Sequence, residues 1–278
     1  MANTLSPGAA SAHSIDPALD EIEEIKPLDE KENFWPIRLV AIVSFLGLWE
    51  VLGSYVVDPL MLSAPSKITE ALFDLLVSGE LLDALYQSAT TLIYGFVLAT
   101  VIGILLGMFI GRYRKVEAAT DWLVNGLYAT PLVALVPLVT LWFGLGFSAK
   151  LFIVCIISVF PILINTASGV RNVGASLLDV GNAFAADERQ TFVKIILPAS
   201  IPYIMTGIRL GIGRAIIGMI VAEFYTSVGG LGALIMKFGN QYDTAAMFVP
   251  ILTLALMGVL LTTIVRKAEA AFEPWKAS

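Results

Sequence analysis

The sequence predicts an all-α integral membrane protein with six transmembrane helices. Of its 278 residues, 57% are hydrophobic and only 14% are charged, a balance typical of chains whose main solvent is lipid. Several apolar stretches reach the roughly 20 residues that a helix needs to cross the hydrocarbon layer. These stretches are continuous rather than short and alternating, which favours helices over a transmembrane β-barrel.

The apolar stretches mark six expected spans, and each must be helical because lipid offers no water to an unpaired backbone. In chain order they cover residues 37–57, 85–110, 118–143, 151–168, 200–224 and 245–265. The third span contains Pro131 and Pro137, which remove backbone hydrogen bonds at membrane depth. Such a break requires cover, either from packed protein or from a water-filled cavity.

Two segments outside the spans have their own character. Residues 1–36 carry eight acidic and two basic side chains, so their net charge of −6 equals that of the whole chain. We expect them to form a flexible, acidic cytosolic tail, separate from a membrane domain over residues 37–278. Between the first two spans, Ile68, Leu72 and Leu75 recur at helical spacing. They predict an interfacial helix within residues 63–83.

The basic residues indicate how the spans are oriented, because lysine and arginine accumulate on the cytoplasmic side. One set of connections and ends holds most of them: Arg38, Arg112, Arg114, Lys115, Arg171, Arg189, Lys194, Arg266, Lys267 and Lys276. The opposite loops hold Lys67, Lys150 and Lys237. We therefore expect both termini, and the connection after the fourth span, to lie in the cytosol.

The residue inventory argues against an enzyme. His13 is the single histidine and Cys155 the single cysteine, so the chain can build neither a His/Cys metal cluster nor a disulfide. The spans offer no histidine as a base beside a nucleophile. The sequence also lacks the G-x-x-x-x-G-K-[ST] loop that cradles nucleotide phosphates.

A polar segment over residues 179–198 interrupts the apolar chain. Val180 and Phe184 follow Leu177 at helical spacing, which predicts a short amphipathic helix over residues 175–184. Asp187 precedes Gln190 by three residues, the spacing of a capping box that starts a second helix. We expect this second helix to end before Pro198.

Two short helices joined by a tight turn are marginal on their own. They need either the headgroup layer of the membrane or the groove of another protein to remain folded, and both interpretations stay open at the level of the residues.

The same segment resembles the coupling motif of ABC-importer permeases, E-A-A, three residues, G, nine residues, I-x-L-P. Asp179, Val180 and Gly181 stand at the E-A-A positions, Ala185 at the glycine, and Ile195, Ile196, Leu197 and Pro198 at I-x-L-P. Because alanine adopts a left-handed conformation less readily than glycine, we expect the turn at Ala185 to stay closer to the right-handed α region.

The resemblance extends over nearly the whole chain after residue 36. The chain is most similar to the nitrate, sulfonate, taurine and bicarbonate branch of binding-protein-dependent permeases. The matching pieces include Ser88, Trp142-Phe143-Gly144-Leu145-Gly146 with Lys150, Gly207-Ile208-Arg209, Ala222-Glu223, Gly230-Leu231-Gly232 and Trp275. It implies the type I ABC importer (MetI-like) permease fold. It also implies the coupling residues Asp179, Val180, Gly181, Phe184, Ala185, Asp187, Arg189, Ile195, Leu197 and Pro198, in helices over residues 175–198.

The resemblance further implies a set of partners. Two copies of the chain would form the path for a small anionic solute in a bacterial inner membrane, surrounded by lipid. Two separate ATPase subunits would bind ATP and magnesium, and a substrate-binding protein would deliver the cargo. The chain itself would hold no cofactor and contact no nucleic acid.

Charged residues inside spans are expensive and therefore candidates for function. Arg214 and Glu223 lie in the fifth expected span and Glu50 in the first. With Pro137, they are the candidate residues of the translocation path. Arg214 either faces the path and attracts an anion, or is neutralised by one of the two glutamates. A self-contained secondary transporter or channel is the alternative function, but it predicts inverted internal repeats, and none is evident.

Overall fold

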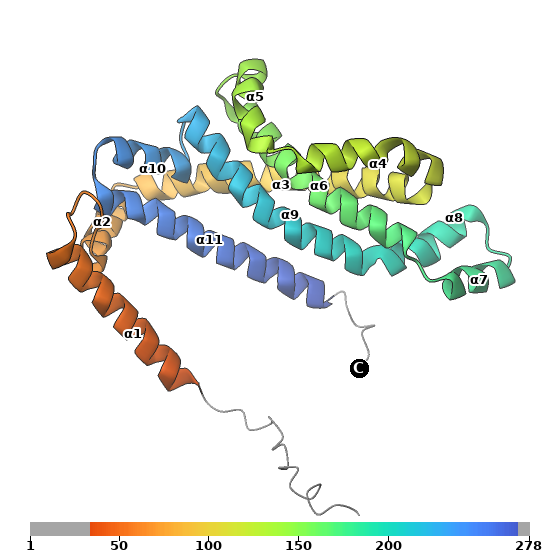
Figure 1. Ribbon diagram of the computed structural model, residues 1–278, viewed down its shortest axis with the longest axis horizontal. Helices are drawn as coiled ribbons and strands as arrows, with labels where there is room; N and C mark the ends of the chain where they lie inside the picture. The colour runs from red at the N-terminus through yellow and green to blue at the C-terminus, as the bar shows by residue number, and fades with distance from the viewer. Residues whose placement is uncertain (1–33, 272–278) are drawn as a thin grey trace, which may run out of the picture. The chain divides into compact units, whose positions relative to one another are not determined.

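The computed structural model describes residues 34–271, which are helical throughout apart from short connections (Figure 1). In chain order the elements are α1 (Trp35–Val51), a π-helical turn (Leu52–Val56), α2 (Pro65–Val77), α3 (Glu80–Arg112), α4 (Arg114–Ala129), a 3-10 turn (Leu132–Leu135), α5 (Val136–Phe143), α6 (Phe147–Arg171), α7 (Ala175–Ala183), α8 (Glu188–Thr191), a π-helical turn (Phe192–Ile196), α9 (Leu197–Thr226), α10 (Leu231–Asn240) and α11 (Thr244–Ala271).

The tail expected over residues 1–36 lies outside the described residues except at its end, where Trp35 already begins α1. The chain divides after Leu46 into two compact units. The described part of the first unit is the beginning of α1. The second unit contains the rest of the described chain, residues 47–271, and with it every candidate site residue.

Five of the six expected spans are single helices long and apolar enough to cross a membrane. The third span, expected over residues 118–143, is instead a pair of helical segments bent by 84°. Thr130 ends α4 in an extended conformation, with φ −70° and ψ 136°, because the ring of a following proline disfavours the helical region for the residue before it. Pro131 therefore turns the chain, and Pro137 falls in the first turn of α5, where a proline is tolerated.

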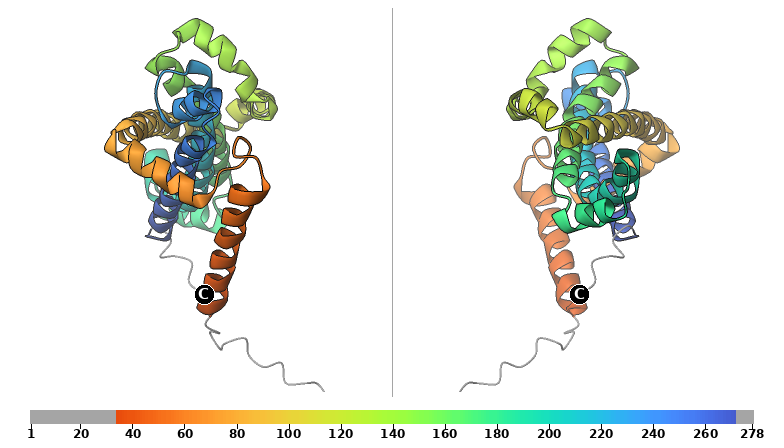
Figure 2. Two further views of the ribbon diagram at one scale, coloured as in Figure 1. Left: turned by 90° about the vertical axis from the view of Figure 1, so that its left-hand side faces the viewer. Right: turned by 90° about the vertical axis from the view of Figure 1, so that its right-hand side faces the viewer.

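The centre of the second unit is formed by α6, which lies alongside α3 and α9 (Figures 1 and 2). In the most apolar stretch of α6, 67% of the residues are buried, compared with 22% in the most apolar stretch of α3. Small residues permit the close approach of α3 to α6: a Cβ atom added to Gly107 would lie 2.6 Å from the carbonyl oxygen of Leu163. A side chain at this position would push the two helices apart.

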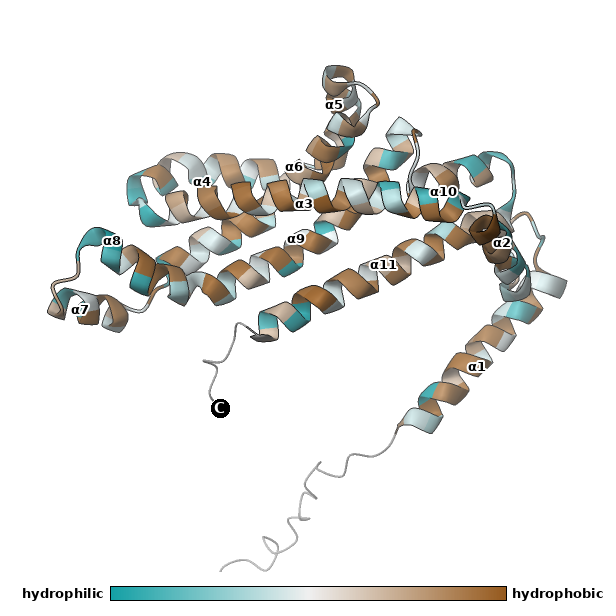
Figure 3. Cartoon of the chain, turned by 180° about the vertical axis from the view of Figure 1, so that it is seen from behind, coloured by the Kyte–Doolittle hydropathy of each residue, from teal (hydrophilic) through white to brown (hydrophobic). Residues whose placement is uncertain are grey.

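The helix expected within residues 63–83 is present as α2. Ile68 and Leu75 are buried against neighbours that include α11, and Leu72 is 37% exposed. Figure 3 shows hydrophobic residues along α3, α9 and α11, whereas α8 is mainly hydrophilic. The polar segment of the sequence thus stands at the end of long apolar helices.

Candidate functional site

The expected helix pair of the polar segment is present as α7 and α8, joined by a short turn. Asp187 caps α8: its Oδ1 accepts the backbone N–H of Gln190 at 2.7 Å, and the Gln190 side chain accepts the N–H of Asp187 at 3.2 Å. This confirms the predicted capping box, which pairs two donors that a helix start would otherwise leave free.

The expectation for Ala185 was wrong, because this residue is left-handed with φ 51°. The N–H of Ala185 binds the carbonyl of Asn182, and the N–H of Ala186 binds that of Gly181, both at 3.0 Å. This pair of bonds is a Schellman motif, which requires a left-handed residue just after the helix. The bonds that close α7 therefore impose on alanine a conformation that glycine adopts more easily.

The second helix also does not end before Pro198. The short helix α8, the π-helical turn and α9 run on as one helix, Glu188–Thr226, of 39 residues. Pro198 lies in the first turn of α9, directly after the wide turn in which the N–H of Leu197 binds the carbonyl of Phe192. A proline removes only one helical hydrogen bond, and a π-helical turn is a local irregularity that can absorb it.

The other residues expected to take part in coupling divide into packed and exposed side chains. Gly181 is buried against the second helix, and a Cβ atom there would lie 2.7 Å from Ile195 Cδ1. Asp179 and Arg189 are exposed. Phe184 is 82% exposed and Val180 53%. The helix pair therefore packs on itself through Gly181 and presents charged and apolar side chains outward.

Ion pairs connect this end of the chain to other helices. Arg112, the last residue of α3, lies 2.6 Å from the Glu188 carboxylate at the start of α8. A cavity of about 490 Å³ lies beside this pair and is lined also by Arg189 and Phe192. Arg171 at the end of α6 pairs with Glu117 of α4. These ion pairs join the start of α8 to α3, and α6 to α4.

The structure does not bring the four path candidates together. The Arg214 guanidinium lies 5.9 Å from the ring centroid of Tyr128 on α4, and among residues 34–271 it forms no ion pair. Neither Glu50 nor Glu223 neutralises it. Pro137 is exposed at the start of α5.

Glu50 instead supports the start of α2. Its carboxylate accepts the N–H and hydroxyl of Ser66 at 3.0 and 2.7 Å, and the hydroxyl of Ser54 at 3.1 Å. The residue at the cap position of α2, Ala64, has no side-chain hydrogen bond to offer. A carboxylate at a helix start satisfies free N–H groups and complements the helix dipole.

Glu223 is completely buried and organises the start of α10. Its carboxyl oxygens accept the Ser88 hydroxyl at 2.7 Å and the N–H of Gly232 at 2.8 Å, while Ser88 Oγ accepts the N–H of Leu231 at 2.8 Å. The backbone of Gly230 lies so close to this carboxyl group that any side chain at position 230 would collide with it. Gly230 also has a φ of 99°, which other residues rarely adopt.

Lys150 binds the other end of the connection between α9 and α10. The Lys150 ammonium donates to the carbonyls of Val228 and Gly229 at 2.9 and 2.8 Å. Sequence reasoning singled out Ser88 and Lys150 as matching residues but missed that they support one connection, because they lie on different helices. Among the described residues, no three His, Cys, Asp or Glu side chains gather as a metal site.

Comparisons with known proteins agree on one family. The family described as "Binding-protein-dependent transport system inner membrane component" matches residues 99–277. Among curated relatives, the Bacillus subtilis "Putative aliphatic sulfonates transport permease protein SsuC" is 32% identical over 97% of this chain and 98% of its own length. The "Formylaminopyrimidine transport permease protein ThiX" of Halalkalibacterium halodurans is 30% identical over 82% of this chain and 91% of its own.

Solved structures agree on the fold. A chain of the MetNI methionine ABC transporter, in an inward-facing conformation, has a TM-score of 0.56 at 18% identity, covering 70% of this chain and 97% of its own. A chain of an amino acid ABC transporter crystallised with histidines has a TM-score of 0.52 at 19% identity, covering 73% of this chain and 96% of its own.

Proposed function

This chain belongs to the family of binding-protein-dependent transport system inner membrane components, as a permease of an ABC importer rather than an enzyme, and from this premise we propose how it works. Two copies form the path for a small anionic solute. Separate ATPase subunits, which bind ATP and magnesium, dock on α7 and α8. A substrate-binding protein delivers the solute on the opposite side.

The exposed side chains of α7 and its turn support the docking of an ATPase. Phe184 and Val180 offer apolar surface, and the charged Asp179 and Arg189 of the same helix pair are also exposed. A large aromatic side chain that is 82% exposed suits the desolvated centre of a protein interface, and charged side chains suit its polar rim.

The continuous helix Glu188–Thr226 is the observation that carries the proposal. The Asp187 cap begins this helix, and Arg214 lies within it. A helix of 39 residues at about 1.5 Å per residue extends over roughly 60 Å. Displacement of its first turn by an ATPase would therefore move its membrane portion directly, as packed helices shift in other switching proteins.

The ion pair between Arg112 and Glu188 supports a second route for the same motion. It joins the start of this helix to the end of α3, and α3 packs along the central helix α6. A single displacement of α8 would thus act on two membrane helices at once. This arrangement suits a gate whose helices must move together.

Arg214 is the proposed path residue with the strongest chemical argument. Its side chain is exposed, lies near the Tyr128 ring and has no carboxylate partner within residues 34–271. A guanidinium within a membrane span is costly and favours an anion beside it. Since one relative is named as an aliphatic sulfonate permease, an organosulfonate is the first cargo to test. Pro137 remains a candidate lining residue, and Glu50 and Glu223 would act by supporting neighbouring helices.

We further propose that the chain lies in a bacterial inner membrane with both termini in the cytoplasm. The basic residues at the ends of α3, α6 and α11 support this orientation. It would place α7 and α8 in the cytosol, within reach of an ATPase. The acidic segment before α1 would then lie in the cytosol as well.

The test is reconstitution of the chain in vesicles with its candidate ATPase and binding protein. We expect loaded binding protein to stimulate both ATP hydrolysis and uptake. Arg214→Gln should lower uptake of an anionic cargo while the complex still assembles, and Arg214→Lys should retain part of it. Uptake by this chain without an ATPase would instead support a secondary transporter or channel, and failure of Arg214→Gln to assemble would assign Arg214 a structural role.

A further inference from the structure

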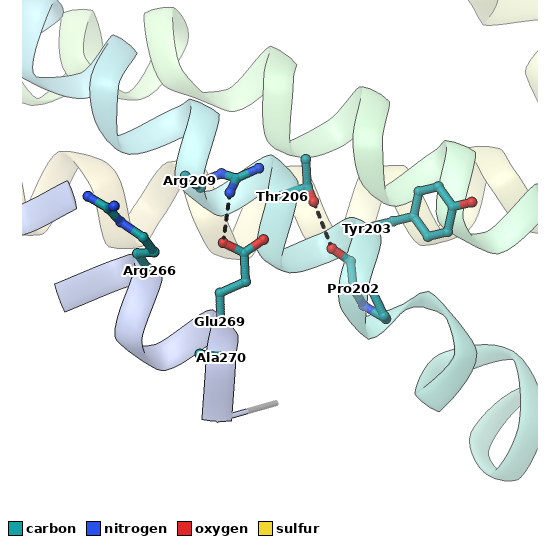
Figure 4. Close-up of a pocket in the computed structure, with 7 residues that line it drawn as sticks. All are labelled: Pro202, Tyr203, Thr206, Arg209, Arg266, Glu269 and Ala270. Atoms are coloured by element: carbon teal, nitrogen blue, oxygen red, sulfur yellow. Dashed lines mark hydrogen bonds and ion pairs between the residues drawn. The ribbon is translucent and has the colours of Figure 1, made fainter. Parts of the chain in front are cut away.

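A cavity of about 520 Å³ opens between α9 and the end of α11. Figure 4 shows Arg209 reaching from α9 towards Glu269 of α11, with Thr206 and Tyr203 following along α9. Arg266 lines the same cavity from α11. Neither the coupling segment nor the proposed path uses these residues.

Glu269 holds one of the two arginines in place. The Arg209 guanidinium lies 3.1 Å from Glu269 Oε2, and the Glu269 side chain is only 10% exposed against 47% for Arg209. A guanidinium carries five N–H donors, and the ion pair with Glu269 uses only part of them. The half-exposed remainder of Arg209 is therefore fixed in position and still able to donate.

Arg266 adds a second positive charge without a partner of its own in the described chain. It lies three residues before Glu269 on α11, its side chain is exposed, and no carboxylate of residues 34–271 pairs with it. With Arg209 and Glu269 it leaves the cavity with one net positive charge. Both arginines line the cavity, from different helices, and arginine is well suited to binding phosphate-type oxyanions.

The depth of the cavity fits the border of a membrane. The 28 residues of α11 extend over roughly 42 Å, which exceeds the roughly 30 Å of hydrocarbon. Arg266 and Glu269 lie in the last two turns of α11, where a spanning helix leaves the hydrocarbon for the headgroup layer. Basic pockets between helices at this level bind anionic headgroups.

We propose that this cavity binds a phosphate-type oxyanion, held by Arg209 and Arg266, which bridges α9 and α11. The anion comes either from a lipid headgroup or from free phosphate. The proposal stands apart from the transport function above, because it concerns neither the coupling segment nor the cargo.

The experiment uses the purified full-length chain and its Arg266→Gln variant. Retention of phosphatidylglycerol, against phosphatidylcholine as the zwitterionic reference, is counted by native mass spectrometry, and radiolabelled inorganic phosphate is titrated by equilibrium dialysis. Lys267→Gln is the matched control, since it removes the same charge from the next residue of α11, which does not line the cavity. Arg266→Lys tests whether the charge alone suffices.

Loss of one charge-assisted contact to phosphate should weaken binding about tenfold in Arg266→Gln. Screening by salt should limit the loss in Lys267→Gln to less than about twofold. This pattern with phosphatidylglycerol identifies a lipid site. The same pattern with inorganic phosphate, and no preference for phosphatidylglycerol, identifies a soluble anion. Binding of neither probe, or equal losses in the two glutamine variants, overturns the proposal.

Discussion

Replacing Ala185 with glycine is expected to stabilise the turn between α7 and α8. Ala185 has φ 51°, and the left-handed conformation raises the free energy of an L-residue by about 1–2 kcal/mol. Glycine avoids this strain but loses more conformational freedom on folding, which offsets about 0.5–1 kcal/mol of the gain. At the middle of both ranges the net stabilisation is about 0.75 kcal/mol, which corresponds to a roughly three- to fourfold lower population of the open turn.

Amide hydrogen exchange of the full chain in nanodiscs measures this change locally, because the turn opens without global unfolding. The informative amides are those of Ala185 and Ala186, which bond to the carbonyls of Asn182 and Gly181. Protection of both should rise in Ala185→Gly. Ala186→Gly is the matched control, because Ala186 does not have a positive φ and glycine there should lower protection. Equal or lower protection in Ala185→Gly than in the unaltered chain would refute the reasoning.

Three further changes test the cap of α8, the buried Glu223 network and the ion pair between α3 and α8. Asp187→Ala removes the cap of α8 and should destabilise the helix start by about 1 kcal/mol, seen as faster exchange of the Gln190 amide, whereas Asp187→Asn should retain most of the protection. Glu223→Gln leaves one of two buried donors without an acceptor and should lower stability by about 1–3 kcal/mol; a thermal midpoint equal to that of the unaltered chain would contradict the buried network. For the partly exposed pair of Arg112 and Glu188, a double-mutant cycle with glutamine substitutions should give a coupling energy of about 0.2–1 kcal/mol that falls with salt, and a zero value in low salt would remove the proposed link from α8 to α3.

Local features of the fold were predictable from the sequence. Apolar runs of sufficient length located five spans, and the spacing of Asp187 and Gln190 located the start of α8. These signals depend on residues within one helical turn or one continuous run. Pro131 signalled a broken third span, although the 84° angle between its two parts depends on the side chains that pack around them.

Features that depend on distant residues were not predictable. Ser88 and Glu223 are 135 positions apart in the chain and meet only because α3 and α9 pack together. The partner of Glu50 is Ser66 rather than Arg214, which no periodicity indicates. Ala185 is left-handed because the bonds to Gly181 and Asn182 close α7, so the tendency of alanine alone predicted the wrong conformation.

The wide turn at Phe192–Ile196 has a consequence for how the two ends of the long helix face. Each residue rotates an α-helix by about 100° about its axis. One residue more or fewer in this turn would therefore rotate α8 by about that angle relative to α9. The turn therefore sets the rotational phase between the exposed face of α8 and the face of α9 that carries Arg214. A substitution within it can leave that phase intact, whereas a single insertion or deletion would aim α8 in another direction.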